Sequence, residues 1–294
     1  MKDISISKNN KRILNNINLN LSAGNIYGLI GENGAGKSTL MKILTNNISG
    51  YRGKVYFFNE EKNYQKDIRK YISGIIEQPS NYDYLSGWQN ICQYHRLYNL
   101  NIDKKEIEKI AREFNMDRHL TKKVRKYSLG MKQRLYLMQI LSVRPRILIL
   151  DEPFNGLDPN AMIVFKNFLK KLRQKQCIIL ISTHILSELD DLCDYIFLMK
   201  NGEIKFHKSI NNINKIKTYK LEVDNEVLVF NMLINSGYNV QKDENGIIIK
   251  SPEVIIPDIV KKICLSGFKI FSVIPEQDTI ESIFLRYKEE KEEV

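Results

Sequence analysis

The sequence predicts an α/β fold built on a mixed sheet, and two observations lead to this class. Two continuous apolar runs, "RILIL" and "CIILIS" at residues 146–150 and 177–182, flank a stretch with helical periodicity, which is the βαβ rhythm of a parallel sheet. A glycine-rich loop, "GENGAGKST" at residues 31–39, directly follows the compact apolar run 26–30 and opens another helical pattern. A strand, a glycine-rich loop and a helix in this order are typical of a phosphate-binding fold.

Composition excludes several other classes. The 294 residues are 43% hydrophobic and 27% charged, which does not fit a disordered or fibrous chain. No apolar run reaches about 18 residues, the length of a membrane-spanning helix. The first residues lack the apolar core of a secretory signal, so we expect a cytosolic protein. The four cysteines are scattered without metal-ligand spacing, as buried thiols in a reducing compartment are.

The charge of the chain is uneven. The net charge is +11, but residues from 213 onward carry 11 Lys and Arg against 14 Asp and Glu, which leaves +14 on residues 1–212. A basic half of this kind is compatible with nucleic acid, anionic lipid, a polyanionic small ligand or simply a lysine-rich solvated surface. Charge alone does not choose among these.

The other elements of the larger domain follow in order. Residues 4–7 and 17–21 read as strands, and strict alternation in the second predicts an exposed strand of an antiparallel β subdomain. Residues 79–145 carry three helical patterns and predict a helical subdomain. After the βαβ segment, residues 195–206 predict a hairpin that turns at Asn201–Gly202.

A polar link rich in Asn and Lys separates two domains. We place the boundary near residue 214, with the larger domain at 1–213 and an accessory domain at 214–294. The accessory domain predicts a compact α+β unit without a glycine-rich loop or a cluster of catalytic side chains. Its expected strands are 219–223, 239–242, 247–250 and 269–274, and its expected helices are 226–237, 254–267 and 279–291.

The glycine-rich loop fits the pattern G-x-x-x-x-G-K-[ST]. Its glycines allow backbone N–H groups to surround phosphate oxygens, and the positive end of the following helix favours an anion. Lys37 is expected to reach the β- and γ-phosphates of a nucleotide, and the Ser38 hydroxyl is expected to bind Mg²⁺. The expected nucleotide-binding residues are Gly31, Asn33, Gly34, Ala35, Gly36, Lys37, Ser38 and Thr39.

An acidic pair ends the apolar run of "ILILDEP". Asp151 is placed to hold Mg²⁺, through water, and Glu152 to polarise the water that attacks the γ-phosphate. The alternative is that both carboxylates only cap a turn before Pro153. A chain that already carries a phosphate-binding loop favours the catalytic interpretation.

Residues 127–131, "YSLGM", begin a helix that leads to this acidic strand. Together with the phosphate-binding loop and "LDEP", they resemble the signature of ABC-type ATPases, whose usual form is L-S-G-G-Q. Ser128 and the second glycine, Gly130, are kept; the first glycine and the glutamine are not. The resemblance implies a P-loop NTPase fold of the ABC ATPase type, in which Ser128 and Gly130 contact the γ-phosphate of ATP held by a second subunit.

The remaining elements of this family occur in order over residues 1–212. Gln78 matches the glutamine that senses Mg²⁺ and the attacking water, Asp158 in "NGLDP" matches the residue that reaches across the dimer, and His184 matches the histidine that contacts the γ-phosphate. The resemblance thus implies Glu152, His184 and Gln78 as catalytic residues, and Ser38, Gln78 and Asp151 as Mg²⁺ ligands. One position departs from the family: the aromatic residue that usually stacks on adenine is replaced by Lys8.

Within the family, "SLGMKQRL" and the short C-terminal domain resemble ATP-binding subunits of ABC-2-type exporters of the bacitracin-resistance, lantibiotic-immunity and peptide-export group. "TIESIFLRY" near the C-terminus matches a common ending of that group. This resemblance implies an ATP- and Mg²⁺-dependent ATPase at the inner face of the cell membrane, paired with a second ATPase subunit and a separate polytopic permease. An antimicrobial or amphipathic peptide is the expected substrate, and a drug or other small molecule is the alternative.

Residues 79–100 are the expected contact with the permease, although the aromatic side chains there fit a helical core equally well. They are Tyr82, Tyr84, Trp88 and Tyr94. A soluble ABC ATPase that acts on nucleic acid or ribosomes is an alternative from another class, but the chain has one ATPase half and no zinc module or long coiled coil. We therefore expect no nucleic-acid partner. The C-terminal domain could also bind a small regulatory ligand or mediate dimerisation.

Overall fold

The computed structural model covers the whole chain, and the structure describes residues 1–9, 11–58, 60–61, 71–75, 81–210, 217–243, 246–251 and 255–276. The chain divides into two compact units, Met1–Lys208 and Ser209–Val294, which are described one at a time. Among the described helices, none is long and apolar enough to cross a membrane.

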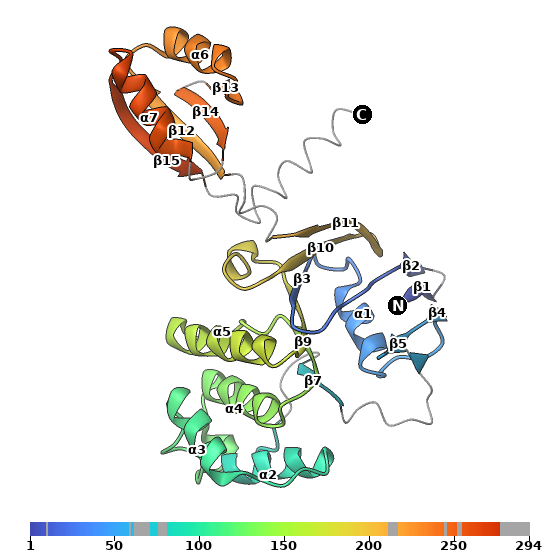
Figure 1. The fold of residues 1–294 in the computed structure, drawn as a ribbon. Helices are drawn as coiled ribbons and strands as arrows, with labels where there is room; N and C mark the ends of the chain where they lie inside the picture. Colours follow the sequence, from blue (N-terminus) through green and yellow to red (C-terminus); the bar gives the residue numbers. More distant parts are fainter. Residues whose placement is uncertain are drawn as a thin grey trace. The chain divides into compact units, whose positions relative to one another are not determined.

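The centre of the first unit is a six-stranded sheet in the order β11-β10-β3-β9-β8-β7 (Figure 1). The neighbours from β10 to β7 run parallel, and β11 follows β10 after the turn at Asn201–Gly202. Strands β3, β8, β9 and β10 are short, largely apolar and buried because helices cover both faces of a parallel sheet. Their bounds are β3 Ile26–Ile30, β7 Ile72–Ile75, β8 Ile147–Asp151, β9 Ile178–Thr183, β10 Tyr195–Lys200 and β11 Glu203–Ser209.

Two helices cover this sheet from opposite sides (Figure 1). Helix α1 (Lys37–Leu44) packs its buried leucine, methionine and isoleucine side chains into the main apolar cluster with β3 and β8 residues. Helix α5 (Pro159–Gln174) begins with Pro159 at a position that needs no N–H donor, after the N-cap residue Asp158. The sheet and these helices confirm the predicted α/β class with a mixed sheet.

A small antiparallel sheet, in the order β2-β1-β4, lies beside α1. It consists of β1 (Lys2–Lys8), β2 (Lys11–Ile17) and β4 (Arg52–Lys54), and the short pair β5 (Tyr56–Phe57) and β6 (Glu60–Glu61) follows it. The expectation of a strand over 17–21 is wrong, because the strand ends at Ile17. Leu19 is nevertheless buried and exchanges two backbone hydrogen bonds with Met1, at 2.8 and 3.2 Å.

The three helical patterns of the middle segment form helices that lie together at one end of the unit (Figure 1). They are α2 (Gly87–Leu97), α3 (Lys104–Glu113) and α4 (Leu129–Ser142). Each begins at a polar N-cap that accepts a hydrogen bond from a first-turn amide, and these caps are Ser86, Asp103 and Ser128. Helix α2 also has a complete capping box between Ser86 and Gln89.

The second unit is a four-stranded antiparallel sheet in the order β13-β14-β12-β15, with two helices packed on one face. Its elements are β12 (Lys217–Val223), α6 (Glu226–Asn235), β13 (Val240–Asp243), β14 (Gly246–Ser251), α7 (Ile256–Leu265) and β15 (Ile270–Glu276). The helix expected over 279–291 lies outside the described residues.

Candidate functional site

The glycine-rich loop leaves the carboxyl end of β3 and leads into α1. Gly36 is the N-cap residue of α1 and has a φ of 103°, which a side chain rarely allows. A Cβ atom at Gly36 would lie 2.8 Å from Leu14 Cδ2 and 3.0 Å from the Ile13 carbonyl oxygen. Gly36 has no side chain that could cap α1, so no side-chain cap occupies the first N–H groups of this helix. This geometry fits a phosphate, since it joins a helix N-terminus to a loop whose glycines admit close backbone approach.

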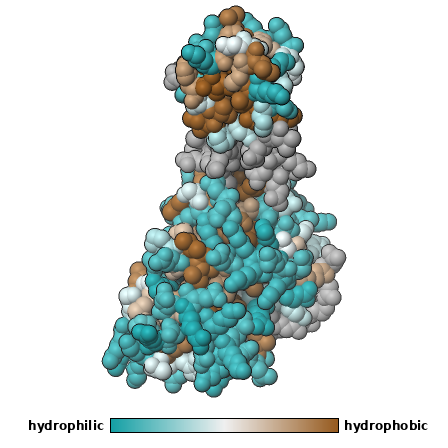
Figure 2. Space-filling view, turned by 60° about the vertical axis from the view of Figure 1, so that its left-hand side comes forward, coloured by the Kyte–Doolittle hydropathy of each residue, from teal (hydrophilic) through white to brown (hydrophobic). Residues whose placement is uncertain are grey.

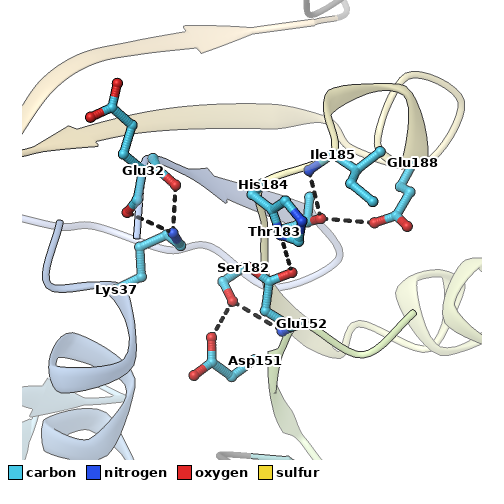
Figure 3. Close-up of polar contacts among 10 residues, drawn as sticks. Glu32, Lys37, Asp151, Glu152, Ser182, Thr183, His184, Ile185 and Glu188 are labelled. Atoms are coloured by element: carbon cyan, nitrogen blue, oxygen red, sulfur yellow. Dashed lines mark hydrogen bonds and ion pairs between the residues drawn. The ribbon is translucent and has the colours of Figure 1, made fainter. Parts of the chain in front are cut away.

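Lys37 is the buried cation of this loop and only 7% exposed. Its Nζ donates to the carbonyl oxygens of Gly31 at 2.5 Å and Glu32 at 3.2 Å (Figure 3). Burial lowers the pKa of the Lys37 ammonium, whereas the charges of Glu152 and Asp151 oppose this shift. The predicted lysine and the predicted acidic pair therefore share one electrostatic environment.

The acidic pair lies at the carboxyl end of β8 and is held by Ser182 of the neighbouring strand β9. The Ser182 hydroxyl donates to Asp151 Oδ1 and accepts from the Glu152 N–H at 3.1 Å. The same N–H also points to the Ser182 carbonyl oxygen at 3.1 Å. Glu152 has a φ of 48°, a left-handed conformation that is uncommon for residues other than glycine. Backbone strain of this kind is concentrated at functional sites.

His184 directly follows β9, and its side chain contacts Glu152. Its Nδ1 lies 2.8 Å from Glu152 Oε2 (Figure 3). An ionised carboxylate can only accept, so the histidine Nδ1 carries the hydrogen. The structure thus brings together four residues that the sequence analysis selected, which are Lys37, Asp151, Glu152 and His184.

Ser128 and Gly130 lie at the start of α4. The Ser128 hydroxyl accepts from the Met131 N–H at 3.3 Å, and a Cβ atom at Gly130 would meet only the Gly156 carbonyl oxygen, at 3.5 Å. This is an ordinary contact, so within this chain the described residues give no steric reason for glycine at position 130. Gly130 lies beside Gly156 of the loop "NGLDP".

Asp158 ends that loop and serves as the N-cap of α5. Its carboxylate accepts from the Ala161 N–H at 3.0 Å and forms an ion pair with Arg134 of α4. These two hydrogen bonds, in that order, lower the pKa of Asp158. Arg134 thus links the helix that carries Ser128 and Gly130 to Asp158 of the loop "NGLDP" within one subunit. The sequence analysis did not select Arg134.

Two further predicted positions remain. Gln78 lies outside the described residues, so its expected role stays a prediction. Lys8 is exposed at the end of β1, opposite Lys11.

The donors present fit ATP and Mg²⁺. A magnesium ion at a nucleotide site is usually held by one or two protein oxygens together with substrate phosphates. The Asp151 carboxylate and the Ser38 hydroxyl at the start of α1 are oxygen donors of this kind, and α1 contacts β8. Among the described residues there is no cluster of three His, Cys, Asp or Glu side chains that would bind a metal without a nucleotide.

A glycine loop at a helix N-terminus, a buried lysine and an acidic pair on the adjacent strand define a nucleotide-hydrolysing P-loop protein. Comparisons narrow this class further: the sequence profile of the family described as ABC transporter matches residues 14–155. An uncharacterized ABC transporter ATP-binding protein of Bacillus subtilis (strain 168), YdbJ, is 30% identical over 97% of this chain and 94% of its own length. The chain belongs to the ATP-binding proteins of ABC transporters, and it is an ATPase.

Two further relatives carry more specific names. The lantibiotic transport ATP-binding protein SrtF of Streptococcus pyogenes is 36% identical, over 74% of this chain and 93% of its own length. The bacitracin transport ATP-binding protein BcrA of Enterococcus faecalis is 31% identical, over 92% of this chain and 90% of its own length. A solved structure described as the ATP-binding subunit of an ABC transporter has a TM-score of 0.66 and 28% identity, over 72% of this chain and 90% of that chain.

Proposed function

We propose that this chain powers an exporter of antimicrobial or amphipathic peptides. The observation that carries the proposal is the similarity to the bacitracin transport protein BcrA, which extends over 92% of the chain and therefore includes the second unit. SrtF, whose similarity covers 74% of the chain, carries a lantibiotic transport name. Lantibiotics and bacitracin are peptide antibiotics, so a peptide is favoured over an unrelated drug.

Within the site, each residue has a proposed task. Lys37 and the amides of the loop bind the β- and γ-phosphates, and Ser38, Asp151 and Gln78 hold Mg²⁺, which neutralises phosphate charge when it is bound. Glu152 orients and deprotonates the attacking water, because its carboxylate is fixed by strained backbone and by His184. His184 is proposed to contact the γ-phosphate.

Two subunits are proposed to enclose the nucleotides between them. Each loop would face Ser128 and Gly130 of the other subunit, and Asp158 would lie at the same interface. The open surroundings of Gly130 within its own chain support this arrangement. The ion pair between Asp158 and Arg134 would then connect the interface to the helical segment. Closure of the dimer would drive a separate permease.

We expect Gly130→Ala to separate folding from turnover. Alanine favours a helix by up to about 1 kcal/mol relative to glycine, and the added Cβ meets only an ordinary contact in this chain. The thermal midpoint should therefore stay equal or rise, while ATP turnover should fall about tenfold or more because the second subunit loses close approach. Calorimetry and phosphate release on the same sample measure both quantities. A variant with normal turnover would contradict the proposed interface.

The permease is proposed to dock on the segment that precedes and includes α2. Tyr82 and Tyr84 form an exposed ring pair with centroids 5.9 Å apart. Tyr94, in contrast, points inward, where its hydroxyl lies 2.9 Å from Ser73 Oγ. The proposed interface role is therefore retained for Tyr82 and Tyr84 and not for Tyr94, and for the partly exposed Trp88 it stays a prediction.

Peptide export is tested in cells that carry the chain with its permease. The permease is first identified by capturing tagged Glu152→Gln protein from detergent-solubilised membranes and by mass spectrometry of what accompanies it. We expect the wild-type pair to raise resistance to bacitracin or to a lantibiotic several-fold, and Glu152→Gln to remove this resistance. Unchanged peptide resistance together with altered resistance to a non-peptide drug would favour the small-molecule alternative.

A further inference from the structure

We propose that Glu188 is a positioning residue for ATP hydrolysis, which fixes the backbone around His184 and so holds the imidazole on Glu152. This inference rests on the proposed roles of Glu152 and His184. Glu188 ends a short 3-10 turn, Leu186–Glu188, that brings its side chain back to the end of β9 (Figure 3). It belongs to none of the sequence motifs that define the nucleotide site.

The contact between Glu188 and Thr183 is the first step. Thr183 is the last residue of β9 and is fully buried. Its hydroxyl donates to Glu188 Oε2 at 2.8 Å and accepts from the Ile185 N–H at 3.0 Å. The Thr183 hydroxyl has one hydrogen, and it is donated to the Glu188 carboxylate. This contact fixes the rotation of the hydroxyl, so that a lone pair of its oxygen faces the Ile185 N–H.

This hydroxyl ties together the residues on both sides of His184. The histidine side chain is itself 49% exposed, so packing alone leaves its ring free to move. Because the Ile185 N–H is hydrogen-bonded to the Thr183 hydroxyl, the backbone of His184 between them is fixed, and with it the direction in which the His184 side chain leaves the backbone. That direction places the histidine Nδ1 2.8 Å from Glu152 Oε2. Loss of the Glu188 acceptor would also leave a buried hydroxyl hydrogen without its partner.

The Glu188 carboxylate is partly buried and lies near the charge of Glu152. Burial raises the pKa of Glu188; the hydrogen bond from Thr183 opposes the shift and the nearby charge of Glu152 adds to it. A second carboxylate near the catalytic carboxylate is unfavourable for stability alone. The hydrogen bond from the Thr183 hydroxyl offsets part of this cost, and the charges of His184 and Lys166 also favour the ionised form of Glu188.

The test compares variants that remove or keep this hydrogen bond in the full-length protein. Glu188→Leu and Thr183→Val remove it, whereas Glu188→Gln and Thr183→Ser keep an acceptor oxygen and a hydroxyl. We expect the first two each to lower kcat about tenfold or more with KM for ATP within about twofold, and the double variant to be no worse than either alone. The conservative pair should retain most of the turnover. Asp117→Asn, an exposed carboxylate of the helical segment, is the control.

A spectroscopic readout separates positioning from general destabilisation. The chain has four histidines, and the Nδ1–H signal of His184 can be assigned by nitrogen–proton correlation with His184→Gln as a blank. We expect Glu188→Leu to shift or broaden this signal in protein that is still folded at the assay temperature, and Glu188→Gln to leave the signal unchanged. Normal kcat in Glu188→Leu would overturn the proposal. So would a Glu188→Gln variant whose kcat and thermal midpoint fall as far as those of Glu188→Leu. If Glu152→Gln keeps full turnover, the assigned role of Glu152 fails instead.

Discussion

Glu152→Gln is expected to lose nearly all ATP turnover while it still binds ATP. Glutamine has the same shape and its amide oxygen can still accept from His184 Nδ1, so the local structure should survive. It cannot take a proton from water, and a positioned general base contributes about 10²- to 10⁴-fold to rate. We therefore expect kcat to fall by about this factor and the ATP dissociation constant to change by less than about threefold.

Phosphate release and equilibrium binding of ATP measure these two quantities. Bound ATP that is not hydrolysed should also keep two subunits together, which sedimentation or light scattering detects as a dimer. Glu222→Gln is the matched control, because Glu222 is an exposed glutamate in the second unit. Turnover close to wild type in Glu152→Gln would show that another group activates the water.

Lys37→Ala is expected to lose nucleotide binding. The lysine is the buried cation beside Asp151 and Glu152, so its removal leaves those carboxylates to repel a polyphosphate. Hydrogen bonds to charged groups contribute about 1.5 to 3 kcal/mol each, so two lost phosphate contacts correspond to at least about 100-fold in affinity. Titration calorimetry with ATP measures the change.

Lys42→Ala in the last turn of the same helix is the control for this substitution, because it removes an equal charge away from the loop. It should bind ATP normally. Unchanged affinity in Lys37→Ala would contradict the assigned loop. A lower thermal midpoint without nucleotide is expected as well, since Lys37 also bonds to Gly31 and Glu32.

Much of the fold could be predicted because its strands are short apolar runs bounded by polar turns. The runs at β3, β8 and β9 are short and continuously apolar, as buried parallel strands are, and the structure contains them at almost the expected residues. The loop before α1 was recognisable because glycine, lysine and serine at fixed spacing have one common physical use. The prediction of a strand over 17–21 is wrong. The alternation of apolar and polar residues there reflects the burial of Leu19 in an irregular segment.

The residues that support the site could not be found in the same way. Ser182, Thr183 and Glu188 act through contacts between elements, and a serine or glutamate near a motif has no distinctive spacing. Ser182 had the best available signal: as the last residue of the predicted parallel strand 177–182, it would be expected beside Asp151, and the register pairs these two residues. Arg134 pairs with Asp158 across 24 positions of sequence, which periodicity cannot show.

The position of β9 has a mechanical consequence. It lies between β3, which leads into the phosphate loop, and β8, which ends in the acidic pair, so these two strands do not touch each other. Any displacement that passes from one to the other through the sheet has to pass through β9, whose end carries Ser182 and His184. Substitutions in the buried middle of β9, such as Ile181→Val, would therefore change how tightly nucleotide binding is linked to hydrolysis, even with every polar side chain of the site intact. The packing of β9 would thus set the strength of this coupling, and evolution could adjust it without changing any residue that takes part in the chemistry.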